Sequence, residues 1–188
     1  MAQNQDQKQT RKQTSDVSKT EKRMIRRPTG RYHDDDFSRY AVTIGAKPEE
    51  VFAYFRDFSN LPTFMKDITS IQVTSAKKSH WIVETKKGGL KAEWDAEITS
   101  ERKNEMIAWK SIEGSDVETS GAIWFSPAPE GRGTVVSLAL DYKIPGGKLV
   151  EWLTFFTGDN PEELAFVNLR RLKAQIETGE VPTVEGQP

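Results

Sequence analysis

The spacing of hydrophobic and polar residues changes along this chain, and the changes predict the order of its elements. Residues 90–98 alternate cleanly, with apolar side chains such as Trp94 and Ile98 on one face and carboxylates such as Glu93 on the other. Such alternation is typical of a strand that buries one side. Short apolar runs separated by turn residues predict strands at 37–44, 68–74, 80–85, 90–98, 106–112, 119–126 and 134–142. Because short turns join most of these runs, we expect an antiparallel sheet.

Helical spacing appears early in the chain, between the first and second of these strands. Pro48 suits the first turn of a helix, where its missing N–H is not needed, and Val51, Phe52 and Phe55 then fall on one face. A second short helical turn should follow around Leu61. The sequence therefore predicts two short helices after the first strand.

A long helix is predicted near the C-terminus, over residues 148–176, with an interruption at 158–161. Asn160 suits the N-cap position, and Pro161 the first position, of the part after the interruption. A curved sheet can bury its apolar face against such a helix. We therefore expect an α+β fold, in which a curved antiparallel sheet of about seven strands wraps around the C-terminal helix.

The composition divides the chain into one domain and two tails. Residues 1–33 carry a net charge of +6 and few apolar side chains, whereas residues 34–188 carry −7. The first segment cannot bury enough apolar surface to offset its ordering entropy. We therefore expect a disordered basic tail at 1–34, a domain at 35–178 and a second disordered tail at 179–188.

The basic tail contains a cluster formed by Lys22, Arg23, Arg26 and Arg27. Such a cluster can contact an anionic membrane surface, but a charge run is more often only a solvated segment. No aromatic residue interleaves the cluster, so a stacking surface for nucleic acid is missing and no specific nucleic acid is expected.

Several classes of function are excluded by the residue counts. The chain has no cysteine and two histidines, which removes thiolate nucleophiles, disulfides and cysteine-ligated zinc. It contains no phosphate-binding loop, zinc-binding HExxH or nucleophile elbow. We expect no metal and no cofactor. No apolar run approaches the length of a membrane span or a signal-peptide core, so a cytoplasmic location is expected.

Several spaced motifs resemble one known family. They are residues 51–65 (VFAYFRDFSNLPTFM), 94–98 (WDAEI), 107–111 (IAWKS), 121–125 (GAIWF), 131–134 (GRGT), 169–173 (LRRLK) and 177–180 (ETGE). Together they resemble the START-like (SRPBCC) superfamily, in particular its polyketide cyclase/dehydrase (coenzyme Q-binding START-like) group. The resemblance implies a helix-grip fold with a hydrophobic cavity between the long helix and the sheet. Members of the superfamily bind lipids, sterols, polyketides or quinones, and only some of them catalyse a reaction.

The resemblance makes the large apolar residues candidates for the cavity wall, although packing between sheet and helix would bury many of them in any case. The candidate cavity residues are Phe52, Phe55, Phe64, Trp81, Trp94, Trp109, Phe125, Leu138, Trp152, Leu153 and Phe156.

The polar residues are weaker candidates for a functional site than the aromatic ones. Glu93, Asp95 and Glu97 alternate with apolar residues and should face solvent, and His80 has no histidine partner nearby, which favours a structural role. Four further residues could reach the cavity if the strand register allows it: Glu84, Ser111, Thr119 and Tyr142. We assign no catalytic residue.

The favoured function is the binding of a hydrophobic small molecule, such as a lipid, quinone or polyketide, in this cavity. One alternative is a cyclase or dehydratase acting on a polyketide, which needs an acid/base pair inside the cavity. Another is a lipid-transfer module that docks to membranes through the basic tail.

Overall fold

The computed structural model describes residues 40–65, 68–84, 91–115, 117–143 and 161–181. Three groups of predictions lie outside these residues: the basic tail, the first part of the C-terminal helix, and the cavity candidates Trp152, Leu153 and Phe156. The tail boundaries at residues 34 and 179 also remain predictions.

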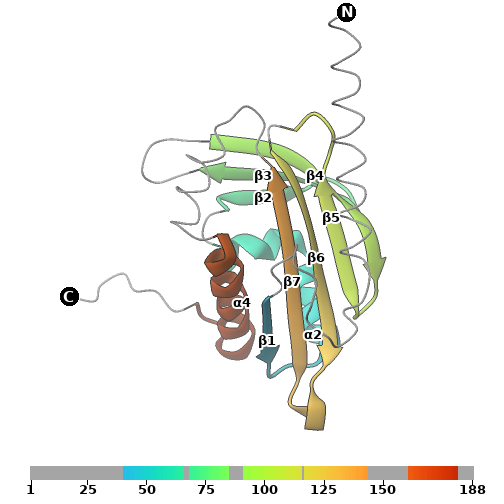
Figure 1. Cartoon of the computed structure of the whole chain (residues 1–188), viewed down its shortest axis with the longest axis vertical. Helices are drawn as coiled ribbons and strands as arrows, with labels where there is room; N and C mark the ends of the chain where they lie inside the picture. Colours follow the sequence, from blue (N-terminus) through green and yellow to red (C-terminus); the bar gives the residue numbers. More distant parts are fainter. Residues whose placement is uncertain (1–39, 66–67, 85–90, 116, 144–160, 182–188) are drawn as a thin grey trace, which may run out of the picture.

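The described elements follow the expected order, as Figure 1 shows. They are β1 (Tyr40–Ile44), α2 (Pro48–Arg56), the 3-10 helix η1 (Phe58–Thr63), β2 (Ser70–Val73), β3 (Lys78–Glu84), β4 (Lys91–Arg102), β5 (Met106–Ser111), β6 (Glu118–Pro127), the 3-10 turn η2 (Pro129–Gly131), β7 (Thr134–Lys143) and α4 (Pro161–Thr178).

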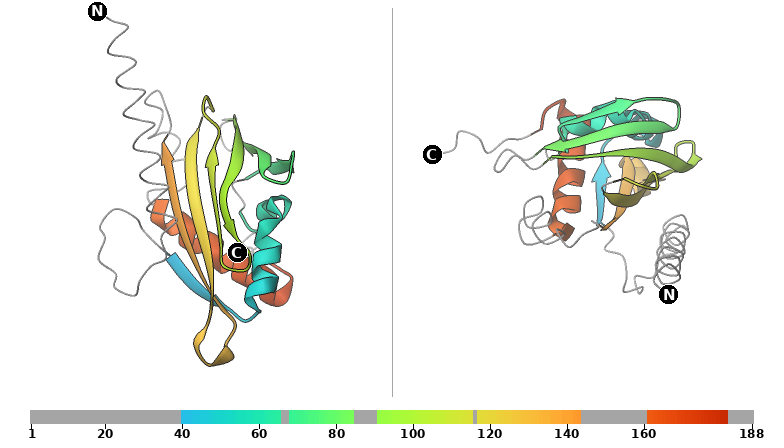
Figure 2. Two further views of the ribbon diagram at one scale, coloured as in Figure 1. Left: turned by 90° about the vertical axis from the view of Figure 1, so that its right-hand side faces the viewer. Right: turned by 90° about the horizontal axis from the view of Figure 1, so that it is seen from above.

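The strands form one seven-stranded sheet in the order β1-β7-β6-β5-β4-β3-β2. Every pair is antiparallel. The two views of Figure 2 show the sheet curving, with α2 and α4 against it. We call the sheet face that packs against these helices the inner face and the opposite one the outer face. The α+β helix-grip fold expected from the sequence is confirmed.

The longest strand, β4, differs from its prediction at its C-terminal end. It continues to Arg102 instead of ending at Ile98, because its register with β5 shifts between Ile98 and Ser100. Such a β-bulge bends a strand and moves the following side chains to the other face. Beyond the bulge, Glu101 reaches Arg56 of α2, with Glu101 Oε2 2.7 Å from Arg56 Nε.

The helix α2 begins where the sequence predicted. Pro48 occupies its first turn, and the Glu50 carboxylate accepts from the Lys47 backbone N–H at 3.4 Å. Its buried residues are Val51, Phe52 and Phe55, the predicted apolar face. Burial of this face against the sheet supplies most of the stability of so short a helix.

The C-terminal end of α4 is tied to the end of β1. Lys173 Nζ donates to the Thr43 carbonyl at 2.7 Å and to the Glu177 carboxylate at 2.6 Å. The same carboxylate accepts from the Gly45 N–H at 2.6 Å. These three bonds share two side chains, and they connect the last turns of α4 to the end of β1.

Candidate functional site

The inner face carries a cluster of aromatic rings supplied by α2, η1 and the sheet. Phe55 is central: its ring centroid lies 5.8 Å from that of Trp109, 6.2 Å from Phe125 and 6.0 Å from Phe58. Phe58 also contacts Trp81 edge-on at 5.7 Å. These rings are all buried. Mutual packing of this kind makes a rigid apolar wall.

The predicted cavity residues that the structure describes lie together at the inner face of the sheet. Those that the structure describes, Phe52, Phe55, Phe64, Trp81, Trp94, Trp109, Phe125 and Leu138, all belong to this core cluster or pack against it. All except Trp94 are buried. Which of them contact a ligand remains a prediction.

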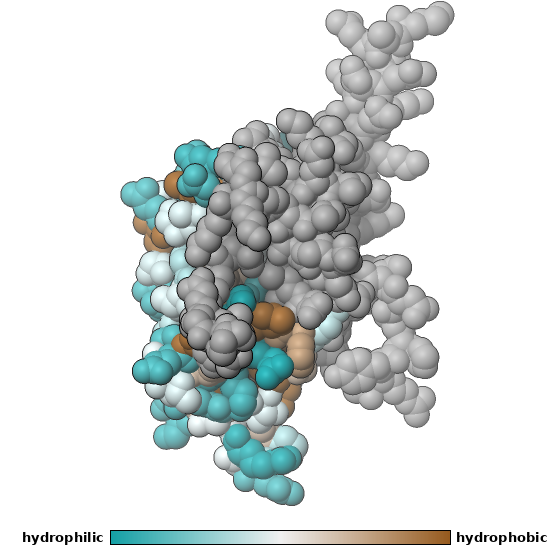
Figure 3. All heavy atoms as spheres, turned by 90° about the vertical axis from the view of Figure 1, so that its left-hand side faces the viewer, coloured by the Kyte–Doolittle hydropathy of each residue, from teal (hydrophilic) through white to brown (hydrophobic). Residues whose placement is uncertain are grey.

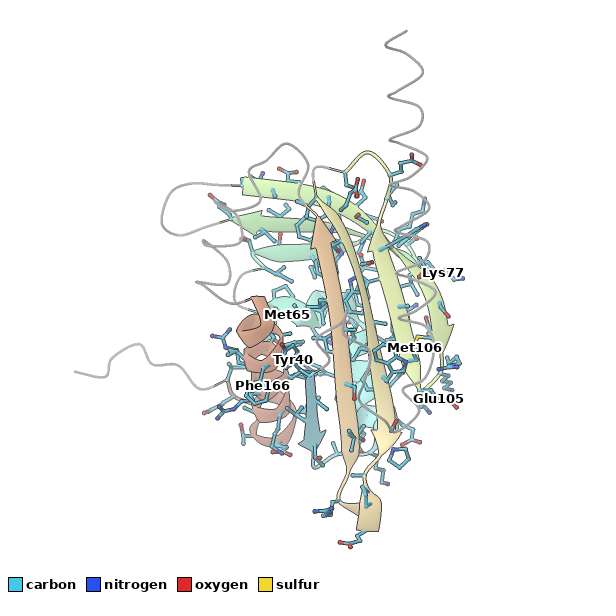
Figure 4. The ribbon with its side chains drawn as sticks, in the orientation of Figure 1. Tyr40, Met65, Lys77, Glu105, Met106 and Phe166 are labelled. Atoms are coloured by element: carbon cyan, nitrogen blue, oxygen red, sulfur yellow. The ribbon has the colours of Figure 1, made fainter. Side chains whose placement is uncertain are left out.

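At the edge of the aromatic cluster, which we call the rim, the side chains are less completely buried. Trp94 stacks on Trp81 at 5.6 Å with 22° between the rings, yet it is only partly buried, as are Met65 and Leu140. Near α4, Tyr40 lies 6.4 Å from Phe166, whose side chain is 40% exposed. Figure 4 shows Tyr40, Met65 and Phe166 close to α4, on the side where the helix meets the sheet.

The surface on the side that carries α4 is mixed in character. Figure 3 shows small separate groups of apolar side chains among polar ones in the described part of this side. In the described part of this side, the apolar side chains are therefore gathered only locally.

A hollow lies along α2, between that helix, the end of β2 and the β4–β5 turn. It has a volume of about 680 Å³ and an apolar floor. Val73, 46% exposed, lies in it, and Phe52 separates it from the aromatic cluster through its contact with Phe125 at 5.6 Å. Arg56 closes one side, where it donates to the Ala76 carbonyl at 2.6 Å. This groove is open, so it does not replace the interior as the candidate site.

One polar residue of α4 lies on the stripe that packs on the inner face. The buried positions Ala165, Asn168, Leu169 and Leu172 recur at the spacing of a single helix face. Asn168 is 2% exposed. Its Oδ1 accepts a long hydrogen bond of 3.4 Å from Arg171. Sequence reasoning missed this residue, although a polar side chain within an apolar helical stripe was a visible signal.

The strand register assigns a face to three of the four polar residues that the sequence left open. Ser111 and Thr119 lie on the inner face, where the Thr119 N–H donates to Ser111 Oγ at 3.0 Å. Glu84 pairs in register with Lys91 and is exposed on the outer face. Tyr142 pairs in register with Thr119.

The carboxylates of β4 face solvent, as predicted, on the outer face. His80 lies between two of them, with Nδ1 2.9 Å from Asp95 Oδ1 and Nε2 3.4 Å from Glu93 Oε2. Lys91 also pairs with Glu93; this bond lowers the pKa of the Glu93 carboxyl and raises the pKa of the Lys91 ammonium. Among the described residues no group of three or more acidic, histidine or cysteine side chains could hold a metal ion.

No helix in the described part of the chain is long and apolar enough to cross a bilayer. The cytoplasmic location remains a prediction.

These features define the class of protein: a helix-grip domain whose inner face is apolar and aromatic, of the START-like type. The chain belongs to the family described as polyketide cyclase / dehydrase and lipid transport, whose sequence pattern matches residues 44–165. Membership supports a role in hydrophobic ligand binding or in cyclase-type chemistry.

Solved structures agree with this assignment. DR_A0006 from Deinococcus radiodurans is 35% identical, with 75% of this chain and 96% of that chain covered and a TM-score of 0.61. A START superfamily protein from Mycobacterium smegmatis is 18% identical, with 71% and 94% covered and a TM-score of 0.51, and shares the fold.

A curated relative is similar over a shorter stretch. An uncharacterized 17.2 kDa protein of Streptomyces lincolnensis is 26% identical over 102 residues, which are 54% of this chain and 65% of that protein.

Proposed function

We propose that this protein binds a hydrophobic small molecule between α4 and the inner face of the sheet. The observation that carries the proposal is the partly covered rim of the aromatic cluster, where Trp94, Met65 and Leu140 are only half-buried. Apolar side chains at such positions give a hydrophobic ligand area to bury, at roughly 25 cal/mol per Å².

Binding is favoured over catalysis by the character of the buried polar groups. In the described part of the chain these are Ser79, Ser120, Thr134 and Asn168. None of them titrates near neutral pH, and acid–base catalysis needs a group that does. Two already have internal partners: Ser79 accepts from the Trp81 indole at 2.8 Å, and Thr134 donates to the Ala46 carbonyl at 2.7 Å.

The ligand is expected to carry at least one hydrogen-bond acceptor. Asn168 supports this, because its side chain is 2% exposed among apolar residues of α4, and polar groups in such places are normally hydrogen-bonded. A lipid ester, a quinone or a polyketide ketone would supply a suitable oxygen, whereas a pure hydrocarbon would not.

The first test is native mass spectrometry of the full chain purified without denaturant, which would detect a bound molecule by its mass. The second is titration with the uncharged fluorophore N-phenyl-1-naphthylamine. Leu140→Lys puts an ammonium at the rim and should weaken binding about tenfold or more, because a charge in an apolar site is strongly disfavoured.

Val135→Lys is the matched control. Val135 is half-buried on the same strand but on the outer face, as its register with Ser126 shows. It should leave the affinity unchanged. Failure of the wild-type chain to bind the fluorophore, or an equal loss in both variants, would contradict the proposal.

A further inference from the structure

The outer face of the sheet carries a second apolar cluster, separate from the aromatic cluster of the inner face. We call it the outer patch; its residues are Met106, Ala108, Ala122, Trp124 and Ala139. Met106 pairs with Trp124, Ala108 with Ala122, and Ala122 with Ala139, so all five side chains point the same way. Figure 4 shows Met106 on the side of the sheet away from α4.

The outer patch is buried in a place where no described element covers it. Met106 is 0% exposed and Trp124 3%. The described helices pack on the opposite face: α2 through Phe52 on Phe125, η1 through Phe58 on Trp109. Helix α4 does so through the stripe already described.

A methionine and a tryptophan on an open sheet face would keep much of their surface in water. These exposed fractions are those of a single chain, which favours a segment of the chain itself over a second copy as the cover.

The position of β1 indicates which segment supplies the cover. Tyr40 pairs with Leu138, so the chain enters the sheet on the strand beside Ala139, at the edge of the outer patch. Residues 1–39 precede this point. By contrast, residues 144–160 lead from β7 to α4 on the inner face, and residues 85–90 join β3 to β4 in the other half of the sheet.

We propose that residues 1–39 dock on the outer patch, with Met24 and Ile25 as the apolar contacts. Val17, Met24 and Ile25 are spaced by seven and eight residues, so a helix formed on docking would bring them to one side. The flanking charges fit as well. Residues 1–33 carry +6, and the outer face of β4 presents three carboxylates, Glu93, Asp95 and Glu97, against the two lysines that pair with them, Lys91 and Lys110.

Docking on the outer patch gives residues 1–39 a role that depends on neither the ligand nor a membrane. It predicts that the side chains of the outer patch become accessible when the segment is displaced. Methionine and tryptophan are readily oxidised when exposed, so Met106 and Trp124 report on this directly.

The experiment is hydroxyl-radical footprinting of the full chain, read by mass spectrometry at Met106 and Trp124. The variant Met24→Glu/Ile25→Glu should raise oxidation of both residues roughly fivefold or more, because burying two carboxylates on the patch is unfavourable. Inner-face Trp109, 5% exposed, is the internal control and should not change. The variant Gln5→Glu/Ser15→Glu adds the same charge at polar positions and should leave Met106 protected.

Each outcome decides the proposal. Rapid oxidation of Met106 in the wild-type chain would show that nothing covers the patch. Continued protection in Met24→Glu/Ile25→Glu, at a concentration where light scattering gives the monomer mass, would assign the cover to another segment. Protection in the wild-type chain that disappears on dilution would point to a second copy instead. Any of these three results overturns the proposal, and none bears on ligand binding at the inner face.

Discussion

The most informative single substitution is Gly121→Ala in the middle of β6. Gly121 pairs in register with Trp109 on one side and Leu140 on the other, and all three lie on the inner face. A Cβ added at Gly121 would lie 2.7 Å from Trp109 Cε2 and 2.9 Å from Leu140 Cδ2. Both distances are far inside van der Waals contact, so the indole must move.

The cost follows from what holds Trp109 in place. Its ring lies 5.8 Å from Phe55 and 5.9 Å from Phe58, and it is 5% exposed, so it has little room to shift. Overpacking in such a core costs about 1–3 kcal/mol. Replacing glycine normally returns about 0.4–1 kcal/mol through the unfolded chain. We therefore expect a net loss of roughly 1–2 kcal/mol.

Urea unfolding followed by circular dichroism measures this loss, and thermal unfolding should show a decrease of about 2–4 °C per kcal/mol. The matched control is the double variant Gly121→Ala/Trp109→Phe. The smaller ring makes room for the methyl group, so the second substitution should cost less in the Gly121→Ala background than in the wild type. A Gly121→Ala chain as stable as the wild type, or more so, would refute the packing argument.

Three other outcomes are expected. Gly133→Ala should lower stability by about 2 kcal/mol or more in denaturant unfolding, because Gly133 has φ +108° and its Cβ would collide with the Ile44 carbonyl; an unchanged midpoint would contradict this. Asn168→Leu should weaken binding of 2-acetylnaphthalene about three- to tenfold by calorimetry but leave 2-ethylnaphthalene unaffected, because only the ketone accepts a hydrogen bond; equal losses would remove Asn168 from the site. The bond from Lys173 holds the pKa of Glu177 below its usual range. Its stabilisation is therefore present above the pKa of the unfolded chain and lost as the pH falls through the lowered folded value. The stability gap between wild type and Glu177→Gln should accordingly shrink from about pH 7 to about pH 3, and a constant gap would exclude this linkage.

The boundaries of β4 illustrate where local patterns stop being informative. Alternation at Trp94, Ala96 and Ile98 was readable directly, because a strand with one buried face must alternate. The continuation to Arg102 was missed, since a bulge at Thr99 reverses the alternation and resembles the end of a strand. Likewise β3 begins at Lys78 rather than at His80, because Lys78 pairs with Glu97 across the sheet.

Some features of the candidate site could also be predicted from the sequence, whereas others depend on tertiary packing. Phe55 could be assigned to the interior from its helical periodicity, whereas Trp109 became a candidate through the family resemblance. That they pack on each other, while Trp94 and Leu140 form a half-buried rim, depends on how α2 and η1 cross the sheet. The position of Asn168 within the apolar stripe of α4 could be read from the sequence, but its burial depends on how α4 packs on the sheet.

What the sequence by itself determined was the order of the elements, the antiparallel sheet, the apolar face of α2 and the solvent-facing carboxylates of β4. Each of these follows from periodicity, turn chemistry or helix-terminus preferences, which act between residues a few positions apart. Only the tertiary structure decided the pairing of His80 with Asp95, the fit of Trp109 over Gly121 and the burial of the outer patch. These features join residues from different strands or leave an apolar surface that other parts of the chain must cover. Their energies depend on register and distance, neither of which is encoded within a single segment.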